Sequence, residues 1–145
     1  DNLPDAWEYV YFNTLTNTAA ADYNKDGLNN LWHYQRNTDP TDADPDRDGM
    51  VNGDENIAGT DPTNASSCLV MEHPPKAVSG TNGFVVEWQS VSGKVYLLTR
   101  ATNLLSAPAF LDLRSNIVGQ GDSTAYTDTW TGSRGPWIYR VVVQP

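Results

Sequence analysis

The stretch Asp44-Pro-Asp46-Arg-Asp48-Gly49-Met50-Val51-Asn52-Gly53-Asp54-Glu55 places aspartates at alternate positions, then a glycine, and a glutamate at position 12. A hard cation such as Ca²⁺ takes roughly six to eight oxygen ligands, and short acidic side chains at alternate positions can wrap one ion. The glycine at position 6 permits the sharp turn that this wrapping needs. The spacing therefore predicts a calcium loop whose ligands are the side chains of Asp44, Asp46, Asp48, Asn52 and Glu55 and the carbonyl of Met50.

A second ladder, Asp22-Tyr-Asn24-Lys-Asp26-Gly27, precedes the first and has the same opening. Its position 12 is His33, and imidazole is a poor ligand for calcium. The loop is therefore either a weaker site or one in which another nearby carboxylate replaces the missing acid, and both readings remain open. The candidate ligands are Asp22, Asn24, Asp26, Asn30 and the carbonyl of Leu28, with Asp39 or Asp42 as the replacement.

Three segments align as repeats, beginning at Asp1, Asp26 and Asp48. Each has room for a loop and one short helix, and the Asp39-Pro40 and Asp61-Pro62 steps end the second and third helices because Asp-Pro favours a turn. The first segment starts partway through its repeat. We therefore expect a piece of a longer protein, with covalently linked upstream domains.

Charge divides the chain in two. Residues 1–64 hold 13 acidic and 3 basic side chains, a net charge of −10, whereas residues 65–145 hold 5 acidic and 6 basic, a net of +1. An acidic chain is a poor nucleic-acid binder, because that affinity comes from lysine and arginine contacts to phosphate.

No apolar run approaches the roughly 20 residues of a membrane-spanning helix. Loops of modest calcium affinity fill outside cells, so we expect a secreted, extracellular or cell-surface protein.

Short β-prone runs separated by Gly, Asn, Ser and Pro turns follow residue 65, for example Phe84–Trp88, Val95–Arg100 and Trp137–Val143. This spacing predicts an antiparallel sandwich. The expected fold class is thus α+β by parts. It comprises calcium-loop repeats with short helices over residues 1–64 and a β-sandwich accessory module over residues 65–145.

Residues 1–64 resemble bacterial thrombospondin type 3 repeats, through Leu3-Pro-Asp-Ala-Trp-Glu8, Asp26-Gly-Leu28, Asn37-Thr-Asp-Pro40 and Gly59-Thr-Asp-Pro62. That resemblance implies calcium loading. Residues 65–145 are similar to a fibronectin type III-like module that ends secreted proteins of Verrucomicrobia and their relatives, through Val85-Val-Glu-Trp88, Arg100-Ala-Thr-Asn-Leu104 and Tyr139-Arg-Val141. Such tails often follow polysaccharide-degrading enzymes, so this resemblance implies an accessory module.

We expect no catalysis, because His33 and His73 are the only histidines and no G-x-S-x-G segment is present. The expected function is a calcium-binding accessory module whose sandwich binds a polysaccharide or cell-surface glycan. Trp130, in a polar turn context, is the candidate stacking platform, with Arg134 beside it; Trp88 and Trp137 are expected in the core. The alternatives are a structural spacer, an anchoring or secretion tail, and a dockerin-like adaptor for a protein partner.

Overall fold

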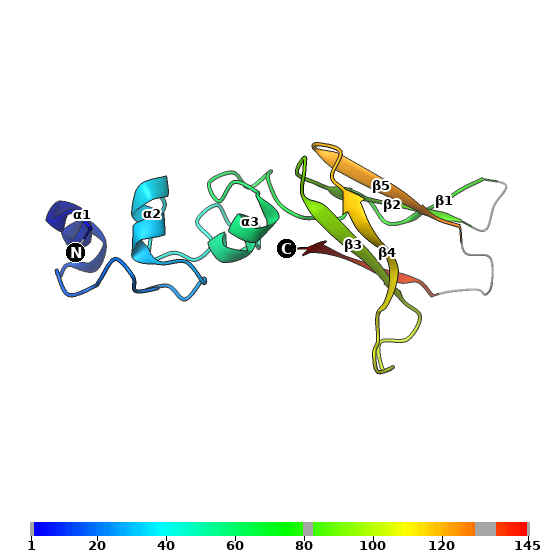
Figure 1. The fold of residues 1–145 in the computed structure, drawn as a ribbon, viewed down its shortest axis with the longest axis horizontal. Coiled ribbons are helices and arrows are strands. Elements are labelled where there is room, and N and C mark those ends of the chain that lie inside the picture. The colour runs from blue at the N-terminus through cyan, green and yellow to red at the C-terminus, as the bar shows by residue number, and fades with distance from the viewer. Residues whose placement is uncertain (1, 80–82, 130–135, 145) are drawn as a thin grey trace. The chain divides into compact units, whose positions relative to one another are not determined.

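The computed structural model describes residues 2–79, 83–129 and 136–144. The chain divides into two compact units, Asp1–Cys68 and Leu69–Pro145, and each is considered by itself. The first unit holds three helices and the second holds six strands, all drawn in Figure 1.

The α+β fold class expected from the sequence is wrong. About 28% of the described chain is strand and 16% is helix, so the protein is β-rich, with two small antiparallel sheets and three short helices in place of a series of calcium-loop repeats joined to a sandwich. The helices are α1 (Asp5–Phe12), α2 (Asn30–Arg36) and α3 (Asn52–Ala58), each about two turns long.

These helices are short because each ends in a left-handed residue. Asn13, Asn37 and Gly59 have φ values of 54°, 55° and 79° at the three C-caps. Asparagine and glycine tolerate this conformation better than other residues, and it reverses the chain and stops the helix. At the other end of α2, the Asn29 side chain accepts a 2.9 Å hydrogen bond from the Trp32 backbone N–H, which caps that helix.

The first unit buries few apolar side chains. Within the described part of this unit, the buried apolar side chains are Leu3, Pro40 and Ala58. Trp7 contacts the rings of Tyr11 and Tyr34 at centroid distances of 5.0 and 5.7 Å, but these rings are only partly covered. Burial of apolar surface therefore contributes little here, and polar contacts carry more of the structure.

The second unit consists of two three-stranded antiparallel sheets (Figure 1). The strand order is β1-β2-β5 in one sheet and β4-β3-β6 in the other, so β2 and β3 are the central strands. The strands are β1 (Lys76–Ala77), β2 (Phe84–Gln89), β3 (Val95–Ala101), β4 (Leu111–Val118), β5 (Ser123–Asp128) and β6 (Ile138–Gln144).

Alternate residues of the two central strands build the core of the second unit. Val86 and Trp88 from β2 meet Tyr96 and Leu98 from β3, and all four are at most 1% exposed. This pattern follows from the two-residue period of a strand, which sends every second side chain to the same face. The prediction that Trp88 belongs to the core is confirmed, because its exposed fraction is 0%. Trp137 was expected in the core as well, but it is only half-buried.

We predict that Trp88→Ala lowers the free energy of unfolding of the second unit by about 3–5 kcal/mol, because it leaves a large cavity between the sheets. Chemical denaturation followed by circular dichroism in the β-sheet region measures this change. Leu105→Ala is the matched control, because Leu105 is 94% exposed and its truncation should change stability by less than about 0.5 kcal/mol. Similar losses for the two variants would contradict the placement of the core.

Candidate metal centre

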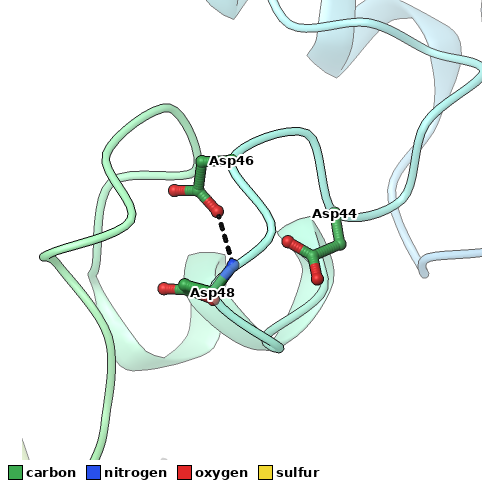
Figure 2. A group of neighbouring side chains, drawn as sticks. All are labelled: Asp44, Asp46 and Asp48. Atoms are coloured by element: carbon green, nitrogen blue, oxygen red, sulfur yellow. Dashed lines mark hydrogen bonds between the residues drawn. The ribbon is translucent and has the colours of Figure 1, made fainter.

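Three aspartates of the loop before α3 gather around a common space (Figure 2). One side-chain oxygen from each of Asp44, Asp46 and Asp48 lies within 4.8 Å of the other two. Carboxylates this close repel one another unless a cation or protons intervene. The three residues therefore form a group that can hold a metal ion.

Each aspartate uses one oxygen to fix the loop. Asp44 Oδ2 accepts from the Gly49 N–H at 3.2 Å, Asp46 Oδ1 from the Asp48 N–H at 3.3 Å, and Asp48 Oδ1 from the Met50 N–H at 2.7 Å. The other oxygens, Asp44 Oδ1, Asp46 Oδ2 and Asp48 Oδ2, are buried and have no hydrogen-bond partner within the described ranges. The loop is thus held rigidly by its own backbone while three oxygens remain available to a ligand.

A tight turn makes this arrangement possible. Arg47 and Gly49 have φ values of 62° and 96°, both in the left-handed region. A side chain at Gly49 would strain that backbone, since only glycine adopts it freely. The loop around Asp26 repeats the geometry, with Lys25 at 62° and Gly27 at 93°.

Glu55 of α3 is a further buried carboxylate near this group, close enough for the charges of the three aspartates to act on it. It is 0% exposed; its Oε1 accepts from Thr60 Oγ1 at 3.1 Å, and its Oε2 has no hydrogen-bond partner among the residues described. Burial raises the pKa of Glu55 to about 7 against the opposing hydrogen bond from Thr60, and the nearby charges of Asp46, Asp48 and Asp44 raise it further. A buried acid with an unpartnered oxygen beside three carboxylates is stable in this position only with a proton or a cation.

In the loop around Asp26, other side chains of the protein form hydrogen bonds with the central carboxylate. Asp26 Oδ2 accepts hydrogen bonds from the side-chain amides of Asn24 at 3.0 Å and Asn52 at 2.9 Å, and His33 Nε2 lies 3.4 Å from it. His33 is 1% exposed, and burial lowers its pKa although Asp26 opposes that shift. Protein N–H groups and a ring nitrogen thus surround the carboxylate that the sequence assigned to a metal.

Asn52 joins the two loops. Besides its bond to Asp26, its side-chain amide donates to the Asp42 carbonyl at 3.1 Å, and the Asn24 amide donates to the same carbonyl at 3.0 Å. A Cβ added at Gly53 would lie 1.9 Å from the Asp26 carbonyl oxygen. The start of α3 therefore packs directly on the backbone of the earlier loop.

The remaining residues assigned to metal from the sequence have other contacts. Asp39 Oδ1 accepts from the N–H and hydroxyl of Thr41, and Asp42 Oδ1 accepts from the Asp44 N–H. The Asp22 side chain accepts from the Gly27 N–H, the Leu28 N–H donates to Asp26, and the Asn30 amide donates to the Thr18 carbonyl. Trp130 and Arg134 lie outside the described residues.

Sequence reasoning did not place Cys68 near the metal centre. Burial raises the pKa of its thiol, and the charge of Asp48 and a hydrogen bond to it raise that pKa further. The thiol therefore lies against one of the clustered aspartates. No local spacing signals this contact, because 20 residues separate the two positions and the chain must fold to join them.

Comparison with known proteins adds no identification. The chain matches no protein-family model, no curated protein and no solved structure. Of the helices that the structure describes, none has the length and apolar character needed to cross a membrane.

We predict that Gly53→Ala destabilises the first unit by about 1–3 kcal/mol, because the new methyl group collides with the Asp26 backbone. At an ordinary helix position the same change would stabilise the protein by up to about 1 kcal/mol, so the sign of the effect is diagnostic. Urea denaturation of the full chain measures it, and Asp54→Ala, an exposed change at the next helix position, is the control. A stabilising Gly53→Ala would refute the close contact.

The buried acid also predicts how the stability of the metal-free protein depends on pH. The folded-state pKa of Glu55, about 7, exceeds the ordinary value of 4.5, so the folded state binds this proton more tightly than the unfolded state does. Its contribution to stability is complete below pH 4.5 and is lost as pH rises through 7, a change of up to about 3 kcal/mol. Denaturation in a chelator at several pH values tests this. Glu55→Gln should flatten the dependence, whereas Asp54→Asn should leave it unchanged.

Proposed function

We propose that the Asp44–Glu55 loop binds Ca²⁺ and that the first unit is a non-catalytic, calcium-stabilised module. The observation that carries this proposal is the fully buried Glu55 carboxylate, whose unpartnered Oε2 accompanies three unpartnered aspartate oxygens. Loops rich in aspartate are common without metal, but a buried and unsatisfied acid beside them is costly unless a ligand fills the space.

The chemistry of the donors favours calcium among the common divalent ions. The three clustered side chains and the nearby Glu55 are all carboxylates, which are hard oxygen ligands of high total charge. Magnesium prefers to keep several waters and is seldom enclosed by dedicated protein cages, and zinc prefers nitrogen and sulfur donors. Asn52 Oδ1, buried and without a partner in the described part of the chain, is a further candidate oxygen.

A bound cation would supply the charge that this unit lacks. Residues 1–64 have a net charge of −10, and the unit buries little apolar surface to oppose the resulting repulsion. Binding an ion to the folded loop but not to the unfolded chain would add its binding free energy to the stability of the fold. The loop then acts as a folding switch that depends on the calcium concentration.

The wider role we propose is that of an accessory or spacer module in a larger secreted bacterial protein. The resemblance of residues 1–64 to thrombospondin type 3 repeats supports this role. Extracellular calcium suits a loop of modest affinity. His33 is buried with its ring nitrogens against Thr38 and Asp26, so this histidine is not placed to act on a substrate.

We predict that calorimetry on the full chain detects calcium uptake and that Glu55→Gln weakens it by at least about thirtyfold, because a charged ligand is lost from an enclosed site. Asp54→Asn removes the same charge from the neighbouring exposed position and should change the affinity by less than about threefold. Absence of calcium uptake, or equal losses in the two variants, would contradict the proposal. Binding of more than one ion per chain would indicate that the loop around Asp26 also takes up calcium.

A further inference from the structure

The last strand of the second unit, β6 (Ile138–Gln144), lies at one edge of the sheet formed by β4, β3 and β6 and is drawn in red in Figure 1. All 7 of its residues pair with β3, from Ile138 opposite Ala101 to Gln144 opposite Val95. Among the residues that the structure describes, no strand pairs with the other side of β6. Alternate residues of an edge strand turn their backbone N–H and C=O groups away from the sheet, where a further strand can bind them.

The three other sheet edges are less suited to the addition of a strand. β1 has only 2 residues. β4 pairs with β3 through register shifts, and Asn116 within it has a φ value of 56°. Short strands and local irregularities of this kind hinder further pairing. In β5 the one aliphatic residue is Ala125, so an added strand would bury little apolar surface there. β6 pairs without a shift over its whole length, contains no proline and has Arg140 as its one charged residue.

Apolar side chains on both faces of β6 are incompletely covered. Tyr139, Val141 and Val143 point toward the core but are only half-buried, and Val142 on the opposite face is 37% exposed. The central strand β3 has a neighbour on each side, and its Leu98, which lies opposite Val141, is 0% exposed. A further strand beside β6 would cover the core-facing valines in the same way and remove apolar surface from water.

From these features we infer that β6 of one copy pairs antiparallel with β6 of a second copy, so that two three-stranded sheets form one continuous sheet in a symmetric dimer. A two-fold axis perpendicular to the sheet gives both copies the same interface. The inference goes beyond the proposed calcium binding and is independent of it, since every residue that carries it belongs to the second unit.

The sequence of β6 is complementary to itself in one register. When Val141 faces Val141 of the second copy, all 7 residues pair, and Tyr139 faces Val143 on the side of the core. On the other side of the sheet Arg140 faces Val142, so the two arginines do not oppose each other. Like charges directly opposite each other would destabilise the pair. The second unit also carries little charge that would repel a copy, since residues 65–145 have a net charge of +1.

The test is sedimentation velocity of the full chain in calcium-containing buffer over a range of protein concentrations. We expect a reversible equilibrium between monomer and dimer. Hydrogen exchange at low and high concentration, followed by nuclear magnetic resonance, should show slower exchange of the β6 backbone amides in the dimer, because the outward amides become hydrogen-bonded. A chain that stays monomeric up to about 1 mM would overturn the inference, as would a dimer in which the β6 amides exchange as they do in the monomer.

Charge at position 142 tests the register. Val142→Arg places an arginine opposite Arg140 of the second copy, twice in each dimer, and should weaken dimerisation about tenfold. Val142→Glu places a carboxylate at the same position, and its dimer should be at least as tight as that of the wild type. These expectations are the reverse of a general charge effect, because the chain has a net charge of −9 and an added positive charge would reduce the repulsion between copies.

Val118→Arg is the matched control, because Val118 is 51% exposed and belongs to β4 at the opposite edge of the same sheet. This variant should dimerise as the wild type does. Equal weakening by arginine at the two positions, or equal weakening by Val142→Arg and Val142→Glu, would overturn the inference. Circular dichroism checks that each variant is folded, and the exchange measurement on the wild type decides the question should Val142→Arg unfold.

Discussion

The first unit depends on how three carboxylates share one small space next to a buried glutamate. The loop brings Asp44, Asp46 and Asp48 together, and their charges act on Glu55 in the first turn of α3. Their mutual repulsion and the desolvation of Glu55 oppose folding, and little buried apolar surface offsets these terms. Neutralising these carboxylates would therefore favour the folded state of the unit.

The two units illustrate different ways of reaching the small net stability of a folded protein. In the second unit, Trp88, Tyr96 and Leu98 are buried between two sheets, and stability follows from the area removed from water. In the first, loops are joined by side-chain amides that each satisfy two acceptors, as Asn24 and Asn52 do. The first unit should therefore respond to ions and pH, and the second to changes of side-chain volume.

The sequence predicts those features that depend on residues close together in the chain. Alternate aspartates followed by glycine indicate the cluster of Asp44, Asp46 and Asp48 that the structure brings together, and strand alternation indicates the burial of Trp88. The fold class was predicted wrongly because the helices are only seven or eight residues long, so the strands of the second unit outweigh them. The two loops share their backbone geometry, but His33 at position 12 of the earlier loop lies beside Asp26, so the side-chain contacts of that loop differ.

Contacts between distant segments could not be predicted in the same way. The bond between Asn52 and Asp26 spans 26 residues, and the pairing of Arg100 with Asp128 spans 28. Neither contact has a local sequence signature, because an asparagine or an arginine at these positions is equally compatible with a solvent-exposed side chain. The half-burial of Trp137 likewise depends on where the loop between β3 and β4 lies.

The double attachment of Asn52 also has a mechanical meaning. Its amide fastens the start of α3 to Asp26 and Asp42, and Gly53 lies on the Asp26 backbone. A force that pulled the ends of the first unit apart would load these contacts before it could straighten the loop between them, because they bridge the chain across that loop. The unit would then resist extension up to the rupture of a few hydrogen bonds and lengthen in one step, which suits a segment that transmits tension.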